Sequence, residues 1–129
     1  MKKLLTLSLF TLFVFTACKK DKDDTPSLKG KWTIVNVVIK EYTGGSLDDT
    51  YTEPGDGTIM DFQNNGNVVT IHPANSLESY PYAIKPDSKV EFGGDIYEIR
   101  DLTASNVTLF LRDDYGPGEY DELYINLKR

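Results

Sequence analysis

Apolar and polar residues alternate along most of the chain with a period of two, and no segment after residue 28 keeps the 3.6-residue period of a helix. Alternation of this kind places successive side chains on opposite faces of a half-buried β-strand. Between these segments lie turn residues such as Asn64-Asn65-Gly66, which accept the positive φ of tight hairpins. The pattern predicts eight strands and no helix, over residues 31–40, 58–63, 67–72, 77–84, 89–92, 96–100, 107–112 and 119–128.

Short antiparallel strands joined by short turns predict one all-β domain, an eight-stranded antiparallel up-and-down barrel, because closure of the sheet removes its exposed edges. A two-sheet β-sandwich shows the same alternation and stays the alternative. Which strand faces point inward is open. Both faces of 31–40 are largely apolar, and in 119–128 either the face of Leu123 or that of Tyr124 could line the barrel.

Gly30 precedes Trp32 by two residues at the start of the first predicted strand. This Gly-x-Trp pattern resembles the opening motif of lipocalins and their bacterial lipocalin-like relatives. The resemblance implies that Trp32 plugs one end of the barrel and that Arg129 or Lys128 packs over its ring through a cation–π contact. The sequence lacks the family's Thr-Asp-Tyr motif and ends with the last strand. The resemblance therefore implies a reduced member, whose cavity its own side chains could fill.

In an up-and-down barrel, the first and seventh loops lie at the end opposite the N-terminus. The first, residues 41–57, has a length typical of a lid, and the seventh spans residues 113–118. Together with the start of the last strand they carry ten acids and no Lys or Arg. Such a rim suits a cation, a sugar or a basic protein surface, although acids also serve solubility alone. The candidate ligand-binding residues are Asp48, Asp49, Tyr51, Asp113, Asp114 and Tyr115.

The N-terminus carries Lys2 and Lys3 and then an apolar run that ends at residue 17. This run is shorter than the roughly 20 residues of a membrane-spanning helix and has the proportions of a cleaved signal. Phe15-Thr16-Ala17-Cys18 resembles the lipobox of bacterial lipoproteins. The resemblance implies a signal peptide over residues 1–17 and acyl chains, palmitate among them, on Cys18 that anchor the protein in the outer membrane. An ordinary secretory signal is the alternative.

Residues 18–27 are charged and contain Pro26, so we expect a flexible tether ahead of the domain at 28–129. Within it, Lys22-Asp23-Asp24 resembles the export signal of surface-exposed lipoproteins in the Bacteroidetes. A solvated linker explains these three residues as well. Display on the cell surface and a periplasmic orientation therefore both stay open.

Loss of Lys2 and Lys3 with the signal leaves 12 Lys and Arg against 20 Asp and Glu, a formal charge of −8 that disfavours nucleic acid. His72 is the only histidine, and Cys18 is assigned to lipid, so a histidine metal cluster or a Cys–His pair is excluded. We therefore expect a monomeric protein that is not an enzyme, with no cofactor and no metal. Two functions stay open: a small-ligand carrier, or an interaction module with a filled core that docks a protein or glycan.

Overall fold

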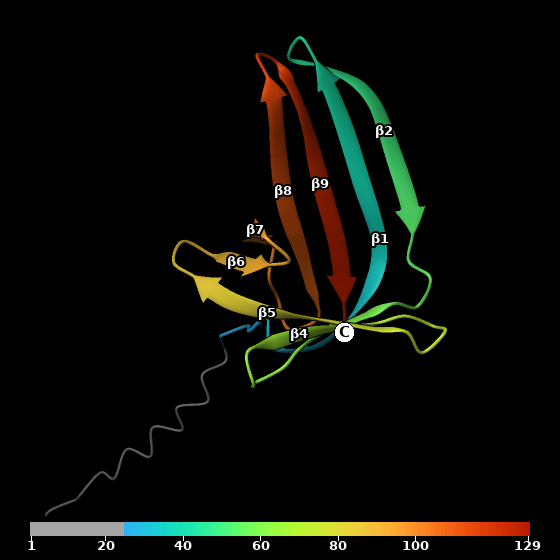
Figure 1. The fold of residues 1–129 in the computed structure, drawn as a ribbon, viewed down its shortest axis with the longest axis vertical. Coiled ribbons are helices and arrows are strands. Elements are labelled where there is room, and N and C mark those ends of the chain that lie inside the picture. The colour runs from blue at the N-terminus through green and yellow to red at the C-terminus, as the bar shows by residue number, and fades with distance from the viewer. Residues whose placement is uncertain (1–24) are drawn as a thin grey trace, which may run out of the picture.

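The computed structural model describes residues 25–129, which form β-strands and turns without a helix (Figure 1). The all-β prediction is thus confirmed. The strands are β1 (Gly30–Thr43), β2 (Ser46–Pro54), β3 (Ile59–Phe62), β4 (Asn67–Ile71), β5 (Leu77–Lys85), β6 (Lys89–Phe92), β7 (Asp95–Arg100), β8 (Asn106–Gly116) and β9 (Glu119–Lys128).

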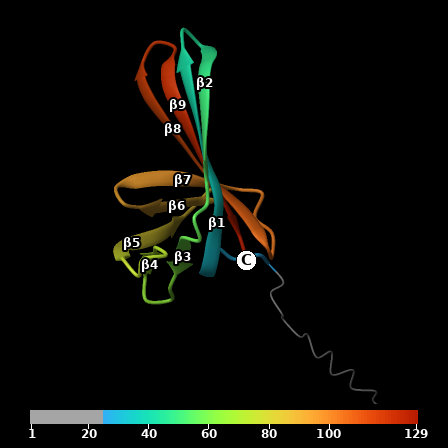
Figure 2. The same ribbon diagram turned by 90° about the vertical axis from the view of Figure 1, so that its right-hand side faces the viewer.

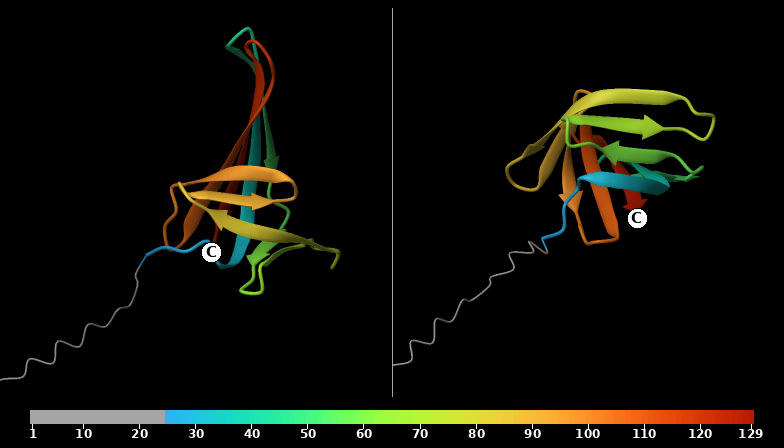
Figure 3. Two further views of the ribbon diagram at one scale, coloured as in Figure 1. Left: turned by 60° about the vertical axis from the view of Figure 1, so that its left-hand side comes forward. Right: turned by 90° about the horizontal axis from the view of Figure 1, so that it is seen from below.

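Eight of these strands close into an antiparallel barrel, as predicted. Each strand from β3 to β9 pairs with the next, and β1 pairs with both β3 and β9. The two-sheet sandwich is therefore wrong, because one continuous sheet returns to its first strand. The strands β4 to β7 run across the direction of β1 and β9 (Figures 2 and 3).

The ninth strand, β2, belongs to a projection that the sequence did not predict. Only Gly30–Thr33 of β1 pair with β3, whereas the longer upper part of β1 pairs with β2. The strands β2, β1, β9 and β8 therefore rise above the barrel as a four-stranded sheet, which we call the arm (Figure 1). The expected lid over 41–57 is wrong. Gly44 and Gly45 adopt φ of 60° and 78°, which allows a tight turn, and the chain returns as β2.

A β-bulge at Val35 explains why both faces of the first strand are apolar. The register of β1 against β9 shifts between Ile34 and Asn36, so one residue is extra. Ile34 pairs with Leu127 below the bulge, and Val37 pairs with Ile125 above it. The inward face therefore passes from even-numbered to odd-numbered residues at this point.

Gly55 packs against the bulge. Its N–H donates to the carbonyl oxygen of Val35 at 2.7 Å, and a Cβ at this position would lie 1.9 Å from the carbonyl oxygen of Ile34. Only glycine allows this close approach. The change of neighbour along β1, from β3 to β2, therefore depends on Gly55.

Large apolar side chains fill the barrel interior. The largest fully buried ones are Trp32, Phe62, Leu109, Leu127, Val68 and Val90. Four rings form a connected series: Tyr97 stacks on Phe92 at 4.5 Å, and Phe62 contacts both Phe92 and Tyr82 edge to face. Burial of Leu109 and Leu127 also shows which face of the last strand, β9, points inward. The face of Leu123 and Leu127 points into the barrel, and the face of Tyr124 points outward.

Arg129 closes the base of the barrel, at the end where the described chain begins. Its guanidinium carbon lies 4.0 Å from the centroid of the Trp32 ring. It also donates to the carbonyl oxygens of Ser27, Lys29 and Ala104 at 2.7 to 2.9 Å. The Trp32 indole N–H donates to the carbonyl oxygen of Leu28 at 2.7 Å. One side chain thus links both ends of the domain to the loop between β7 and β8.

Gly30 lies beside this cluster. It has φ of +107°, and a Cβ there would meet Nη1 of Arg129 at 3.2 Å. Ser27, the last residue of the predicted tether, is already bound to Arg129 through its carbonyl oxygen. The other predicted tether residues up to Asp24, together with the predicted signal and Cys18, lie outside the described residues.

Candidate binding surface

Four carboxylates form a row across the arm. Asp49 on β2 pairs with Glu41 on β1, Glu41 pairs with Asp121 on β9, and Asp121 pairs with Asp113 on β8. Residues directly opposite each other in antiparallel strands have side chains on the same face. The four acids, one on each strand, therefore lie side by side, and we call them the acidic row.

An apolar row lies directly below the acidic row. Two residues nearer the barrel, Tyr51, Ile39, Leu123 and Leu111 occupy the four strands in the same order. This row continues the packed interior upward, because Leu111 and Leu123 pack against the core and are half-buried there. We call this surface, from the acidic row down to the barrel, the inner face of the arm. No Lys or Arg lies on it in the part of the chain that the structure describes.

Two phenols flank the acidic row at its ends. The hydroxyl of Tyr115 donates to Oδ2 of Asp121 at 3.0 Å. A hydrogen bond to Asp49 is the largest cause that raises the pKa of Tyr51, and the bond to Asp121 does the same for the pKa of Tyr115. Both phenols keep their protons at neutral pH, and this face carries no Lys or Arg among the described residues. No base on this face therefore balances the negative charge of the row. Like charges so placed attract cations.

The cations of the arm lie on its outer face instead. Arg112 donates to Oδ1 of Asp114 at 2.9 and 3.1 Å and lies 3.7 Å from the centroid of Tyr120. Lys40 lies over the ring of Tyr124 at 5.0 Å. Positive charge and stacked rings thus gather on one face of the arm, and uncompensated negative charge gathers on the other.

Glu122 organises the phenols of this outer face. It accepts hydrogen bonds from the hydroxyls of Tyr124 at 2.7 Å and Tyr42 at 3.1 Å, and Tyr42 stacks on Tyr120 at 4.4 Å. Burial first, and then the bond to Glu122, raises the pKa of Tyr124 to about 12.

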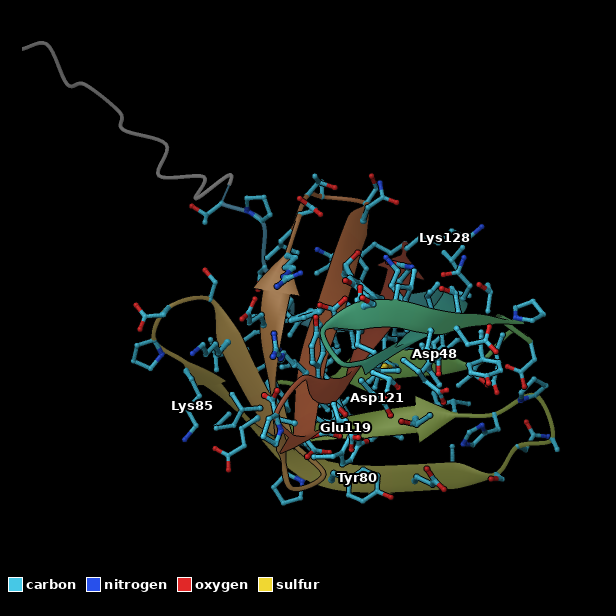
Figure 4. All side chains as sticks on the ribbon, turned by 90° about the horizontal axis from the view of Figure 1, so that it is seen from above. Asp48, Tyr80, Lys85, Glu119, Asp121 and Lys128 are labelled. Atoms are coloured by element: carbon cyan, nitrogen blue, oxygen red, sulfur yellow. The ribbon has the colours of Figure 1, made fainter. Side chains whose placement is uncertain are left out.

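The structure brings part of the predicted ligand-binding set together. Asp49, Tyr51 and Asp113 lie on the inner face, and Tyr115 reaches it through Asp121. The other two candidates lie elsewhere: Asp48 sits where the register of β1 and β2 shifts, and Asp114 pairs with Arg112 on the outer face. Figure 4 looks down on the arm, with Asp48 and Asp121 labelled.

The first and seventh connections do meet, as the topology predicted. The N–H of Gly45 donates to the carbonyl oxygen of Gly118 at 2.9 Å, so the tips of the two hairpins touch. Below the tips, however, β1 and β9 separate β2 from β8. The acids therefore spread over a sheet face and do not surround the mouth of a cavity. Glu41 and Asp121, the middle of the row, were not among the predicted site residues, because only the strand register brings them into line.

Two hollows lie outside the filled core. One, of about 640 Å³, lies at the base and is lined by the start of the described chain together with Ile84, Ile99 and Leu102. The other, of about 510 Å³, lies beside β5 and β6 and includes Tyr80 and Phe92. The acidic row lines neither of them. Among residues 25–129, no group of three or more His, Cys, Asp or Glu side chains could hold a metal ion.

Comparison with known proteins found no family model, no curated protein and no solved structure that matches this chain. None of the residues that the structure describes forms a helix long and apolar enough to cross a membrane.

Proposed function

We propose that this protein is a lipid-anchored, non-enzymatic binding module of the bacterial cell envelope, which docks a cationic partner on the inner face of the arm. One observation carries the proposal: a row of four carboxylates stands above an apolar row, on a sheet face that has no base among the described residues and that rises above the barrel (Figure 1). A partner with positive charge and some apolar surface complements this face, since buried apolar area supplies affinity and opposite charge supplies register.

The packed interior favours docking over carriage of a small ligand. Pockets for small molecules usually measure about 300–1,000 Å³ and enclose most of the ligand. Here Trp32 and Phe62 are fully buried inside the barrel, and the two hollows described above lie outside this core. The rings of Phe92 and Tyr97 pack over this core. A lipocalin-like barrel of this kind serves as a rigid base for the arm.

The predicted anchor gives the arm a direction. Lipid on Cys18 would lie seven residues before Thr25, where the described chain begins at the base. The tips of the arm lie at the opposite end of the molecule from this point (Figure 1). In an outer-membrane lipoprotein, on the cell surface or facing the periplasm, the inner face would thus stand away from the bilayer.

Calorimetric titration of residues 19–129 with hexalysine amide tests the proposal. The row variant carries Glu41→Gln, Asp49→Asn, Asp113→Asn and Asp121→Asn. A matched control removes four exposed carboxylates of the barrel, through Glu78→Gln, Asp87→Asn, Asp95→Asn and Asp101→Asn. We expect the wild type and the control to bind with a salt-dependent affinity and the row variant to lose about tenfold or more. Equal weakening in both variants would mean that only net charge matters and would refute the proposal.

A further inference from the structure

The strand β2 leaves one edge of the arm open. It ends the sheet order and pairs only with β1, and all nine of its residues are exposed. An edge of this kind presents unpaired N–H and C=O groups, which can pair with a strand of another chain. Natural edge strands are usually protected by short length, by charged side chains, by proline or by a bulge. In β2 the register shift lies at Asp48 and the proline at Pro54, so the stretch between them stays regular, and its charged side chains are carboxylates without a lysine.

The register identifies the backbone groups on the open edge. The bond from the Gly55 N–H to Val35 turns the peptide groups of residue 55 toward β1, and in an antiparallel ladder this direction alternates. The groups of Thr50 and Thr52 therefore point outward. The peptide groups of Pro54 point outward in the same way, and its missing N–H is tolerated at an edge position. The N–H of Thr50 donates to the carboxylate of the preceding residue, Oδ1 of Asp49, at 2.7 Å. This is expected of an N–H that is not paired with a neighbouring strand.

The side chains along this edge define the charge of a partner. Asp49, Tyr51 and Glu53 all point to the inner face, because they are every second residue of β2. An added strand would therefore meet a carboxylate, a phenol and a carboxylate in succession on this face. A second copy of β2 would place acids opposite acids, which is destabilising. A strand with Lys or Arg opposite Asp49 and Glu53, and an apolar residue opposite the half-exposed Tyr51, forms favourable cross-strand pairs instead.

We infer that the β2 edge receives an extended protein segment with the pattern Lys/Arg–x–apolar–x–Lys/Arg, which adds a fifth strand to the arm. This inference rests on the proposed function and names the class of its partner. A basic side chain opposite Asp49 draws that carboxylate away from the Thr50 N–H and so frees the donor for the new strand. The added residues then extend both the acidic row and the apolar row below it.

Two peptides of identical composition test this inference. Acetyl-Thr-Lys-Thr-Val-Thr-Lys-Thr-amide places both lysines and the valine on one face of a strand, and its palindromic order fits either strand direction. Acetyl-Thr-Thr-Lys-Val-Lys-Thr-Thr-amide has the same charge but places the lysines on the face opposite the valine. Binding of each to residues 19–129 is followed by chemical-shift changes in two-dimensional ¹⁵N–¹H spectra.

A pair of edge variants separates backbone pairing from side-chain effects. Thr52→Pro removes an outward N–H and leaves the bonds of β2 to β1 intact, whereas Thr52→Ala removes only the side chain. We expect the first peptide to bind about tenfold more tightly than its isomer, with the largest shifts in β2. Thr52→Pro should abolish this preference and Thr52→Ala should keep it.

The possible failures can be told apart. If both peptides bind equally, and Thr52→Pro behaves like Thr52→Ala while the row variant still loses hexalysine, the edge inference is wrong and the proposed function stands. If neither peptide nor hexalysine binds the wild type, both are wrong. Shifts confined to the base or to β5 and β6 also contradict the inference.

Discussion

Truncation of Arg129 should destabilise the domain strongly, although the residue is the last in the sequence and is exposed. Its guanidinium lies over the Trp32 ring and donates to three carbonyl oxygens. A cation–π contact at an exposed site contributes about 0.5–1 kcal/mol. Three hydrogen bonds from a charged but solvent-accessible donor contribute about 0.5–1 kcal/mol each. Together these contacts predict a loss of about 2–4 kcal/mol for Arg129→Ala.

Urea unfolding, followed by the fluorescence of the single Trp32 and by far-ultraviolet circular dichroism, measures this loss. With a denaturant slope of about 1.5 kcal/mol/M, the midpoint should fall by about 1.3–2.7 M. Arg129→Lys keeps the charge but lacks the planar fork, so it should recover about half of the loss. Lys128→Ala, at the exposed neighbouring position, serves as the control and should change stability by less than about 0.5 kcal/mol. An Arg129→Ala midpoint equal to that of Lys128→Ala would refute the reasoning.

Three further predictions concern other parts of the molecule. Gly55→Ala should cost about 3 kcal/mol or more in urea unfolding, because its Cβ would lie 1.9 Å from a backbone oxygen, whereas Gly116→Ala, with open space around it, should cost little. Because the pKa of Tyr124 is raised from 10.0 to about 12, its contribution to stability is complete below pH 10 and is lost between pH 10 and 12. Tyr124→Phe should therefore flatten the alkaline fall in urea midpoint, and an unchanged fall would contradict the assignment. Cys18→Ala should move the protein from the membrane fraction to the soluble fraction, and continued membrane association would contradict lipidation.

The barrel could be predicted because its signals are local. Alternation marks the strands, and Asn and Gly residues mark the turns, so the order of elements follows without knowledge of distant contacts. The inward face could not be assigned from the same pattern. In β1, the bulge at Val35 exchanges the two faces halfway along the strand, and only pairing with β9 shows where this happens.

The arm was missed for a related reason. All nine residues of β2 are exposed, so no apolar alternation marked it, and its acids suggested a loop. The prediction that these acids gather at one end was correct, but they lie on strands and not in loops, and Asp49, Tyr51 and Asp113 share a face. Their alignment with Glu41 and Asp121 depends on the register of four strands, which the sequence does not reveal.

Site-specific photocrosslinking in cells that carry the native gene tests the central claim, that a basic extended partner docks on the arm. A benzoylphenylalanine at Tyr51 lies in the centre of the β2 edge, and the same residue at Leu77 reports on an exposed site of the barrel. We predict ultraviolet-dependent adducts from position 51 that map, by peptide mass spectrometry, to a Lys- or Arg-rich extended segment. Adducts from position 77 alone, or adducts from position 51 that map to acidic or neutral segments, would contradict the account.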